Sequence, residues 1–484
     1  MLALILSFFA GVSLPADSLD MEYSQYRSDS VKEIILQKED SSANRYVKID
    51  KVFIIGNKRT KDRIILRELD LKAGDIFSFA DLERIIKNDE QKVFNTHLFN
   101  DVSINTLFLN DNLVDIVVQV SERWYIFPSP IFEIGGRNFN DWWVNQNRDL
   151  SFVNYGLKLF QRNLRGRNET MRLTAQFGFT QRFEIRYSIP YIDKAQRHGL
   201  SFLYNFSENK NVAYTTENHI QLFAESDNVL RVRRNALVTY THRNSFFDFH
   251  SVDLGFRNNN IADTLAFLNP DYYLGGRTEQ KYLYAGYRYT RDKRDIRFYP
   301  LEGFQYFARI NKYGFGIFDD LDQFDITLGY ARYLNLNKGF YLSNFSSGYV
   351  SGPDQQPYAN FGSLGSGRNF VRGYELFLIE GQSFLLNKTS LRKRIFSGEK
   401  VLKKLSADQF KSIPFTFYLK TYFDFGVVQN FPDYENNRLL SNRYLFGTGV
   451  GIDMVTFYDL IFKLEYSVNR EGNTGLFIGL KSDF

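Results

Sequence analysis

From about residue 123 to the end of the chain, the sequence alternates between apolar and polar residues almost without interruption. In the stretch 323–330, QFDITLGY, one side of an extended chain would carry Phe324, Ile326, Leu328 and Tyr330. The residues between them are polar or glycine. A period of two is typical of β-strands with one apolar face and one polar face. The pattern therefore predicts a large all-β domain.

The predicted strands are long. In 415–425, FTFYLKTYFDF, the apolar face includes Leu419 and Phe423, and the opposite face includes Lys420, Tyr422 and Asp424. The predicted strands span about 10–14 residues, against a usual length of about 5–6. No helix-length pattern interrupts them to cover the apolar face. Because tilted transmembrane strands need this length, and hydrocarbon does not tolerate open sheet edges, we predict a closed transmembrane β-barrel over 123–484.

The barrel is predicted to contain about sixteen antiparallel strands, an even number as in bacterial barrels. They are expected near 126–136, 153–163, 169–179, 181–190, 197–207, 230–243, 247–259, 279–292, 302–313, 321–334, 338–350, 379–394, 412–427, 443–455, 457–468 and 474–484. The segment 208–229 is left open between a loop and an additional strand.

Residues 46–122 mix strand and helix patterns in a separate small domain. Two segments have helical spacing, Lys61–Leu69 and Phe79–Phe94. Three segments alternate as strands, YVKIDKVFII at 46–55, then Val102–Leu109 and Leu113–Ser121. The order strand, helix, helix, strand, strand (βααββ) predicts a compact α+β domain.

The N-terminus begins with the apolar run MLALILSFFAGVSLPA. Residues 1–16 are predicted to be a signal peptide, although no Lys or Arg precedes the apolar region. Residues 17–45 are polar without a clear period and are predicted to be a flexible segment. Elsewhere no stretch reaches the roughly 18 apolar residues of a membrane helix.

Composition and motifs argue against several functions. The chain has no cysteine, which excludes disulfides and thiolate chemistry, and its net charge of +5 is too small to indicate nucleic-acid binding. The five histidines lack metal-ligand spacing, and no nucleophile elbow, P-loop or dinucleotide fingerprint occurs. We therefore predict no enzyme activity, no catalytic residue, no metal and no cofactor. The basic run Arg231, Arg233 and Arg234 is interpreted as a solvated or pore-lining patch rather than a lipid-headgroup site.

Several short motifs carry a family resemblance. The small domain contains GNKRT, ILRELDLKAGD and LFNDVSI, and it resembles a POTRA (polypeptide-transport-associated) domain. The larger region contains NLRGRNE, YSIPYI, RDIRFYPLEGFQY, FVRGY and YFDFGVV, in that order. Together they resemble the superfamily of outer-membrane assembly factors and two-partner-secretion translocators, also called the bacterial surface antigen family. Each motif alone is weak, but their number and order make the resemblance specific.

The resemblance implies a particular site. In that family, the arginine of a V-R-G-[FY] motif lies on a long loop folded into the barrel lumen, where it pairs with an acid on an inward-facing strand. In this sequence the loop is about 351–378, the motif is Val371, Arg372, Gly373 and Tyr374, and the implied partner is Asp424. A guanidinium suits a carboxylate better than an ammonium does. Ser390 stands where many members have a second acid, so Glu375 and Glu465 remain alternative partners.

The resemblance also implies a terminal strand signal and a seam. Gly479 and Phe484 fit the signal, whereas Ser482 replaces a usual apolar residue. The seam would lie between the first and last barrel strands, near 126–136 and 474–484. Pro128 and Pro130 cannot donate ladder hydrogen bonds, which predicts a weakly paired seam. The alternative is that these prolines belong to a linker between the two domains.

The implied function is an outer-membrane translocase or insertase that assists β-rich client proteins, with its POTRA domain in the periplasm of a Gram-negative-type bacterium. The expected partners are unfolded outer-membrane or secreted proteins, membrane lipid, and periplasmic chaperones or accessory lipoproteins. Alternatives are a two-partner-type secretion pore for one dedicated protein, or a plain diffusion channel. A single POTRA domain favours an accessory or specialised member.

Overall fold

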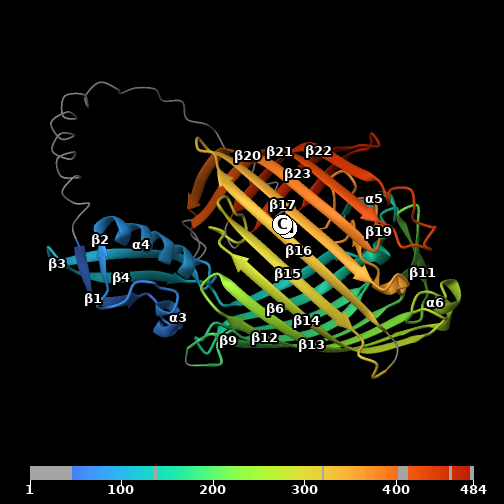
Figure 1. Cartoon of the computed structure of the whole chain (residues 1–484), viewed down its shortest axis with the longest axis horizontal. Coiled ribbons are helices and arrows are strands. Elements are labelled where there is room, and N and C mark those ends of the chain that lie inside the picture. The colour runs from blue at the N-terminus through green and yellow to red at the C-terminus, as the bar shows by residue number, and fades with distance from the viewer. Residues whose placement is uncertain are drawn as a thin grey trace. The chain divides into compact units, whose positions relative to one another are not determined.

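The computed structural model describes residues 46–135, 139–193, 195–318, 321–367, 369–401, 412–456 and 460–479. The predicted signal peptide, the segment 17–45, Ser482 and Phe484 lie outside these described residues. Within them, no helix is both long enough and apolar enough to cross a membrane. A small α/β domain precedes a much larger sheet (Figure 1).

The small domain contains one more strand than the sequence predicts. Its elements are β1 (Tyr46–Ile55), α3 (Asp62–Leu66), β2 (Ile76–Ser78), α4 (Phe79–Phe94), β3 (Phe99–Asn110) and β4 (Leu113–Glu122). The sheet order is β2-β1-β4-β3. Strand β2 has three residues, too few for a period of two to be detected. Val47 and Ile49 are buried because they alternate on one face of β1, and Leu82 and Val93 are buried on α4.

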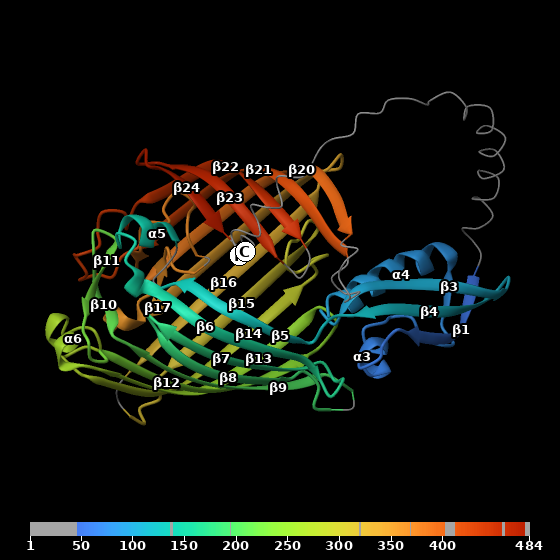
Figure 2. The same cartoon turned by 180° about the vertical axis from the view of Figure 1, so that it is seen from behind.

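The larger part is a single sheet of sixteen antiparallel strands, as predicted. The strands are β5 (Ile126–Ile134), β6 (Val153–Leu164), β7 (Glu169–Gly178), β8 (Gln181–Ile189), β9 (His198–Asn209), β12 (Arg231–Arg243), β13 (Asp248–Ile261), β14 (Glu279–Asp292), β15 (Gly303–Tyr313), β16 (Gln323–Asn335), β17 (Phe340–Gly352), β20 (Ser383–Val401), β21 (Ser412–Gln429), β22 (Tyr444–Thr456), β23 (Ile461–Asn469) and β24 (Thr474–Gly479). Figures 1 and 2 show that this sheet curves into a barrel.

The two faces of the sheet differ as the alternation predicts. Leu419 and Phe423 are 48% and 52% exposed on the outer face of β21, whereas Lys420 and Asp424 between and beside them are buried. The same contrast holds on β23, where Leu464 is exposed and Glu465 is buried. The apolar side chains therefore form the outer surface, and the polar side chains face the lumen.

The two ends of the barrel differ in their connections. At the end where β5 begins, called the entry end, the strands are joined by turns such as 165–168, 244–247 and 293–302. At the other end, called the loop end, most of the connections are longer, and they include α5 (Phe139–Val144) and α6 (Asp263–Leu268). The segment 208–229, left open by the sequence, forms a hairpin of β10 (Asn211–Glu217) and β11 (Ile220–Glu225) in a sheet of its own.

The strand order of the barrel has β24 and β5 as its two ends. The sequence predicts a closed cylinder. Within the described residues the sheet curves into a barrel, and β24 and β5 are the first and last strands of its order. Pro128 and Pro130 both lie within β5 and face Leu159 and Leu157 of β6. They are therefore part of an end strand, and the alternative that they form a linker is wrong. Prolines are tolerated in sheets mainly at such edges.

Candidate functional site

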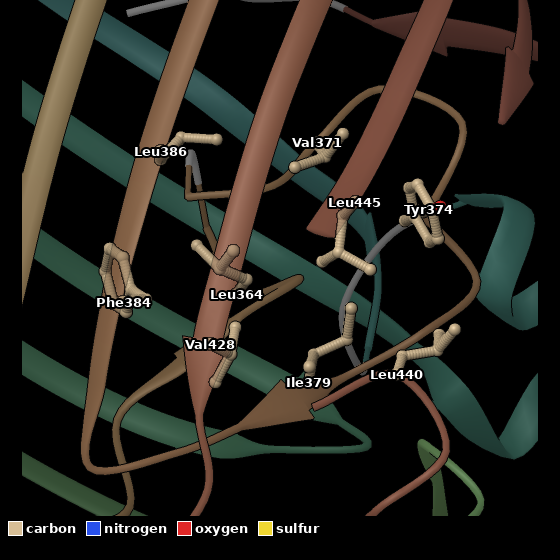
Figure 3. Close-up of a cluster of buried hydrophobic side chains, with 9 residues drawn as sticks. All are labelled: Leu364, Val371, Tyr374, Ile379, Phe384, Leu386, Val428, Leu440 and Leu445. Atoms are coloured by element: carbon tan, nitrogen blue, oxygen red, sulfur yellow. The ribbon is translucent and has the colours of Figure 1, made fainter. Parts of the chain in front are cut away.

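The longest connection at the loop end, residues 353–382 between β17 and β20, folds into the lumen. It contains a short turn of helix, η2 (Tyr358–Asn360), and two short strands, β18 (Ser363–Leu364) and β19 (Ile379–Glu380), which pair with each other. Its buried apolar side chains pack against the inward faces of β20, β21 and β22 (Figure 3). The members of this cluster are Leu364, Val371, Tyr374, Ile379, Phe384, Leu386, Val428, Leu440 and Leu445. We call residues 353–382 the lumen loop.

Arg372 of the lumen loop is fully buried against Asp424 of β21. The Nε atom of Arg372 donates to Oδ2 of Asp424 at 2.8 Å, and the backbone N–H of Arg372 donates to the same oxygen at 3.1 Å. The terminal nitrogen Nη2 lies 2.5 Å from Oδ1 of Asp424. The guanidinium also stacks on Tyr422, 3.8 Å from the ring centroid, and donates to Ser390 Oγ at 3.0 Å. This forked geometry is the one for which arginine is suited and lysine is not.

Two glycines allow the loop backbone to come this close to the barrel wall. Gly373 has φ of +95°, a left-handed conformation that favours glycine. Its carbonyl accepts a hydrogen bond from Asn469 Nδ2 at 2.8 Å. Gly447 lies directly opposite Asp424 in the β21–β22 ladder, and a Cβ there would stand 1.7 Å from the carbonyl oxygen of Arg372. The wall therefore has no side chain at the point where the loop crosses it.

The ion pair is part of a larger buried network. Arg372 lies 3.5 Å from Glu465 of β23, and Lys420 of β21 bridges Glu465 at 2.8 Å and Asp453 of β22 at 2.7 Å. The hydroxyl of Tyr299 donates to Asp453 Oδ2 at 2.9 Å. Tyr299 belongs to the turn 293–302 at the entry end, so the network joins the lumen loop to a turn at the opposite end of the barrel.

The structure brings together most of the residues considered from the sequence. Ser390 accepts a hydrogen bond from Arg372 in place of a second acid, and Glu465 is an additional anionic neighbour. Glu375 instead accepts from the backbone N–H of Gly373 at 2.7 Å. Tyr374 bonds through its hydroxyl to Glu471. Gly479 lies apart from this site, opposite Lys463 at the end of β24.

Sequence reasoning did not identify the members of this network beyond Arg372, Asp424 and Glu465. The alternation placed Lys420 on the lumen face, but gave no sign of its pairing with Asp453. Tyr299 was missed altogether, because it lies in a turn without periodicity. The motif RDIRFYPLEGFQY that contains it was noted only as part of a resemblance.

A second buried polar cluster ties the loop-end connections together. Oε1 of Glu380 in the lumen loop accepts from Thr216 of β10 at 2.9 Å, and Oε2 accepts from Asn437 of the loop 430–443 at 3.2 Å. The hydroxyl of Tyr358 lies 2.9 Å from that of Thr216. The apolar residues around them include Val212, Tyr272 and Tyr273. We call this assembly of the β10–β11 hairpin, the lumen loop and the loop 430–443 the cap.

His219, in the turn of the β10–β11 hairpin, is fully buried in the cap. Its Nε2 accepts a hydrogen bond from the backbone N–H of Leu440 at 2.6 Å, and its carbonyl accepts from that of Leu378 at 2.8 Å. Burial lowers the pKa of His219 to about 4. The imidazole is therefore neutral at physiological pH, as an acceptor in this position must be.

Among the described residues, no three His, Cys, Asp or Glu side chains are placed to hold a metal ion. The buried charges at Arg372, Lys420 and their partners are paired in a way that positions the lumen loop. The arrangement can hold the loop inside the barrel, and its release would change the free width of the lumen.

Family comparisons agree with this architecture. Residues 47–123 match the family described as POTRA, surface antigen variable number repeat, and residues 163–457 match the one described as the Omp85 superfamily domain. The second match spans more than half of the chain. The chain belongs to the Omp85 superfamily. The resemblance inferred from the short motifs is thereby confirmed.

Two solved structures resemble this Omp85 member in fold. BamA from Haemophilus ducreyi lacking POTRA domains 1–3 is 12% identical, with a TM-score of 0.52 and coverage of 95% of both chains. CdiB from Escherichia coli is also 12% identical, with a TM-score of 0.55 and coverage of 89% of this chain and 75% of that chain. No curated protein sequence matches the chain. At such identities the likeness to the two structures concerns the fold alone.

Proposed function

We propose that this Omp85 member inserts β-rich client proteins into the outer membrane of a Gram-negative-type bacterium, with its POTRA domain in the periplasm. The observation that carries this proposal is the pair of end strands, β5 and β24, of an otherwise continuous sixteen-strand sheet. An extended client segment can add to an exposed strand edge through main-chain hydrogen bonds, without strict sequence demands.

The two end strands are poor partners for each other. Strand β5 lacks two backbone donors at Pro128 and Pro130. Within the described residues, β5 and β24 are the two ends of the strand order. A seam between such strands opens at lower cost than any internal ladder, since fewer hydrogen bonds are lost. Opening at the seam would expose both edges to a client and to lipid.

The small domain offers a second place for client binding. The order β2-β1-β4-β3 leaves β3 as a long edge strand of twelve residues. An incoming strand could pair with this edge before it reaches the barrel. The domain would then hold an unfolded client in an extended form, which is the form that a barrel edge requires.

The experiment that tests the proposal is assisted folding of a β-barrel client into lipid vesicles. An unfolded client is added to vesicles with or without the full chain, and its folding is followed by its heat-dependent mobility on a gel. Severalfold faster folding with the full chain supports the proposal. Equal rates in both kinds of vesicle would contradict it.

A secretion pore for one dedicated protein is the second candidate. It is favoured by a polar lumen that a removable loop occupies, because withdrawal of the lumen loop would leave a passage along the barrel axis. The two functions differ in the path of the client. A covalent lock across the seam would block insertion into the membrane and leave axial passage unaffected.

A further inference from the structure

The lumen wall formed by seven neighbouring strands, β7, β8, β9, β12, β13, β14 and β15, carries an excess of positive charge. Its inward positions alternate with exposed outward residues such as Phe183, Leu254 and Ile310. They hold nine arginines and no lysine, among them Arg186, Arg231, Arg233, Arg288 and Arg309. The carboxylates at inward positions of the same strands number three, Glu184, Asp253 and Asp292. We call this surface the arginine wall.

The opposite wall has no such excess. There the lumen loop covers β20, β21 and β22. The buried charges on β20 to β23 are nearly balanced, with four cations (Lys388, Arg392, Lys420 and Lys463) and three carboxylates (Asp424, Asp453 and Glu465). The carboxylates pair with Arg372 and Lys420. The two walls therefore differ in kind. One is neutralised by the protein's own groups, and the other presents its charge to the lumen.

Several arginines of the wall have a buried nitrogen without a hydrogen-bond acceptor. Arg172 pairs with Glu184, but Arg186, Arg288 and Arg309 make no ion pair or hydrogen bond among the described residues. The Nε atom of each of these three is buried without a hydrogen-bond acceptor. Buried donors of this kind normally find a partner, which in a lumen must be water or a ligand.

The strand register places like charges face to face. Arg288 of β14 is directly opposite Arg309 of β15, and Arg186 of β8 is directly opposite Arg172 of β7. Like charges directly opposite in an antiparallel pair are destabilising. An anion lying between the two guanidinium groups would remove this repulsion and satisfy the buried donors.

The arginines are spread along the barrel axis rather than gathered at one point. Arg231 and Arg233 lie two positions apart on β12 close to the loop end, and the Arg288–Arg309 pair lies nearer the entry end. Side chains two positions apart on a strand are about 6.6 Å apart, which is also the spacing on one side of an extended polypeptide. This distribution fits a chain of anionic groups better than a single small anion.

We propose that the arginine wall binds a carboxylate-rich segment of an extended polypeptide inside the barrel lumen. Each guanidinium offers a planar pair of donors to a carboxylate, and the interior of the barrel weakens competition from bulk water. The proposal rests on the proposed function only in taking the natural ligand to be a client protein. The binding itself is a property of the barrel and needs no insertion to be measured.

The test uses the full chain in detergent and a fluorescent oligoglutamate peptide, with binding followed by anisotropy. Wild type is expected to bind oligoglutamate, to bind it more weakly as salt is raised, and to ignore oligolysine of equal length. The double variant Arg288→Gln/Arg309→Gln is expected to bind at least about tenfold more weakly. The matched control is Arg234→Gln, because Arg234 is exposed on the outward face next to Arg233 and should leave binding unchanged.

Some results would overturn the proposal. These are equal binding of the two peptides by wild type, or an equal loss in the control and the double variant. Displacement of the peptide by inorganic phosphate at the same molar concentration would assign the wall to small anions instead. A failure of client folding in vesicles with peptide binding intact would contradict the proposed function and leave the arginine wall standing.

A second measurement does not depend on a variant that folds. In a planar bilayer with a potassium chloride gradient, the reversal potential of the wild-type conductance is expected to show preference for chloride. The double variant, where it folds, is expected to shift the potential toward potassium. A wild-type lumen without chloride preference would contradict an exposed arginine wall.

Discussion

The Nε atom of Arg372 lies 2.8 Å from Oδ2 of Asp424, a residue of β21 that lies 52 positions further along the chain. Neither side chain is accessible to solvent. The contact fixes the tip of the lumen loop to the inner wall of β21. The first predictions concern what happens when this attachment is broken.

Replacing Arg372 by alanine leaves the buried carboxylate of Asp424 without its cation. Removal of one partner from a buried pair typically costs about 3–5 kcal/mol, so the variant should unfold at markedly lower urea concentration. Arg372→Lys should recover only part of the loss, because an ammonium cannot make the forked contact. The double variant Arg372→Ala/Asp424→Asn should be more stable than Arg372→Ala alone.

The matched control for this series is Arg438→Ala in the loop 430–443. Arg438 pairs with Glu435 at 3.1 Å, but both side chains are more than half exposed. An exposed pair contributes less than about 1 kcal/mol, so this variant should resemble wild type. A similar loss in the Arg372 and Arg438 variants would remove the distinction between buried and exposed pairs.

Gly447→Ala should displace the lumen loop without altering any charge. The added Cβ would lie 1.7 Å from the carbonyl oxygen of Arg372, and backbone must move to relieve that contact. The expected result is faster protease cleavage within residues 353–382. Gly348→Ala on β17 is the control, since the nearest atom to its Cβ is the flexible end of Leu385 at 3.3 Å. Equal protease resistance in the two variants would show that the loop does not depend on the gap at Gly447.

The cap should lose stability as pH falls from about 6.5 toward 4. In the unfolded state His219 takes up a proton near its ordinary pKa of about 6.5, whereas burial lowers the folded pKa to about 4. Between these values the unfolded state binds more protons, so acid favours opening of the cap. Protease cleavage of the β10–β11 hairpin at pH 7.5 and pH 5 measures the effect. In His219→Gln this pH dependence should be reduced, and an unchanged pH dependence would contradict the assignment to His219.

Deleting residues 357–376 should convert a small, fluctuating conductance into a larger one. The deletion removes the part of the lumen loop that contains Arg372 and packs on β20, β21 and β22. Single-channel recording in planar bilayers measures the change. A steady wide conductance in the intact protein would instead favour a plain diffusion channel.

Much of the fold could be predicted because one physical pattern determines it. A strand with lipid on one side and a polar lumen on the other must alternate between apolar and polar side chains. This requirement places residues such as Leu419 and Asp424 on opposite faces of the sheet. Strand β2 could not be found, since three residues are shorter than any reliable period. The β10–β11 hairpin was ambiguous because it forms part of the cap and has no lipid-facing side.

The site was predictable only in part. A short motif pointed to Arg372, and the alternation placed Asp424 on the inner face, but neither gave the register that brings Gly447 opposite Asp424. The contact of Lys420 with Asp453 depends on the same register. The approach of Tyr299 depends on how an entry-end turn folds back into the lumen, which no local pattern encodes.

Client insertion by a barrel locked across its seam tests the central claim most directly. Because the natural sequence has no cysteine, one cysteine in β5 and one in β24 give a single disulfide, formed by oxidation and released by reduction. The control disulfide joins positions 468 and 474, which face each other in the β23–β24 ladder and do not cross the seam. The account predicts that the seam disulfide stops client folding into vesicles until it is reduced, while the control does not. Full activity in the oxidised, seam-locked protein would contradict it.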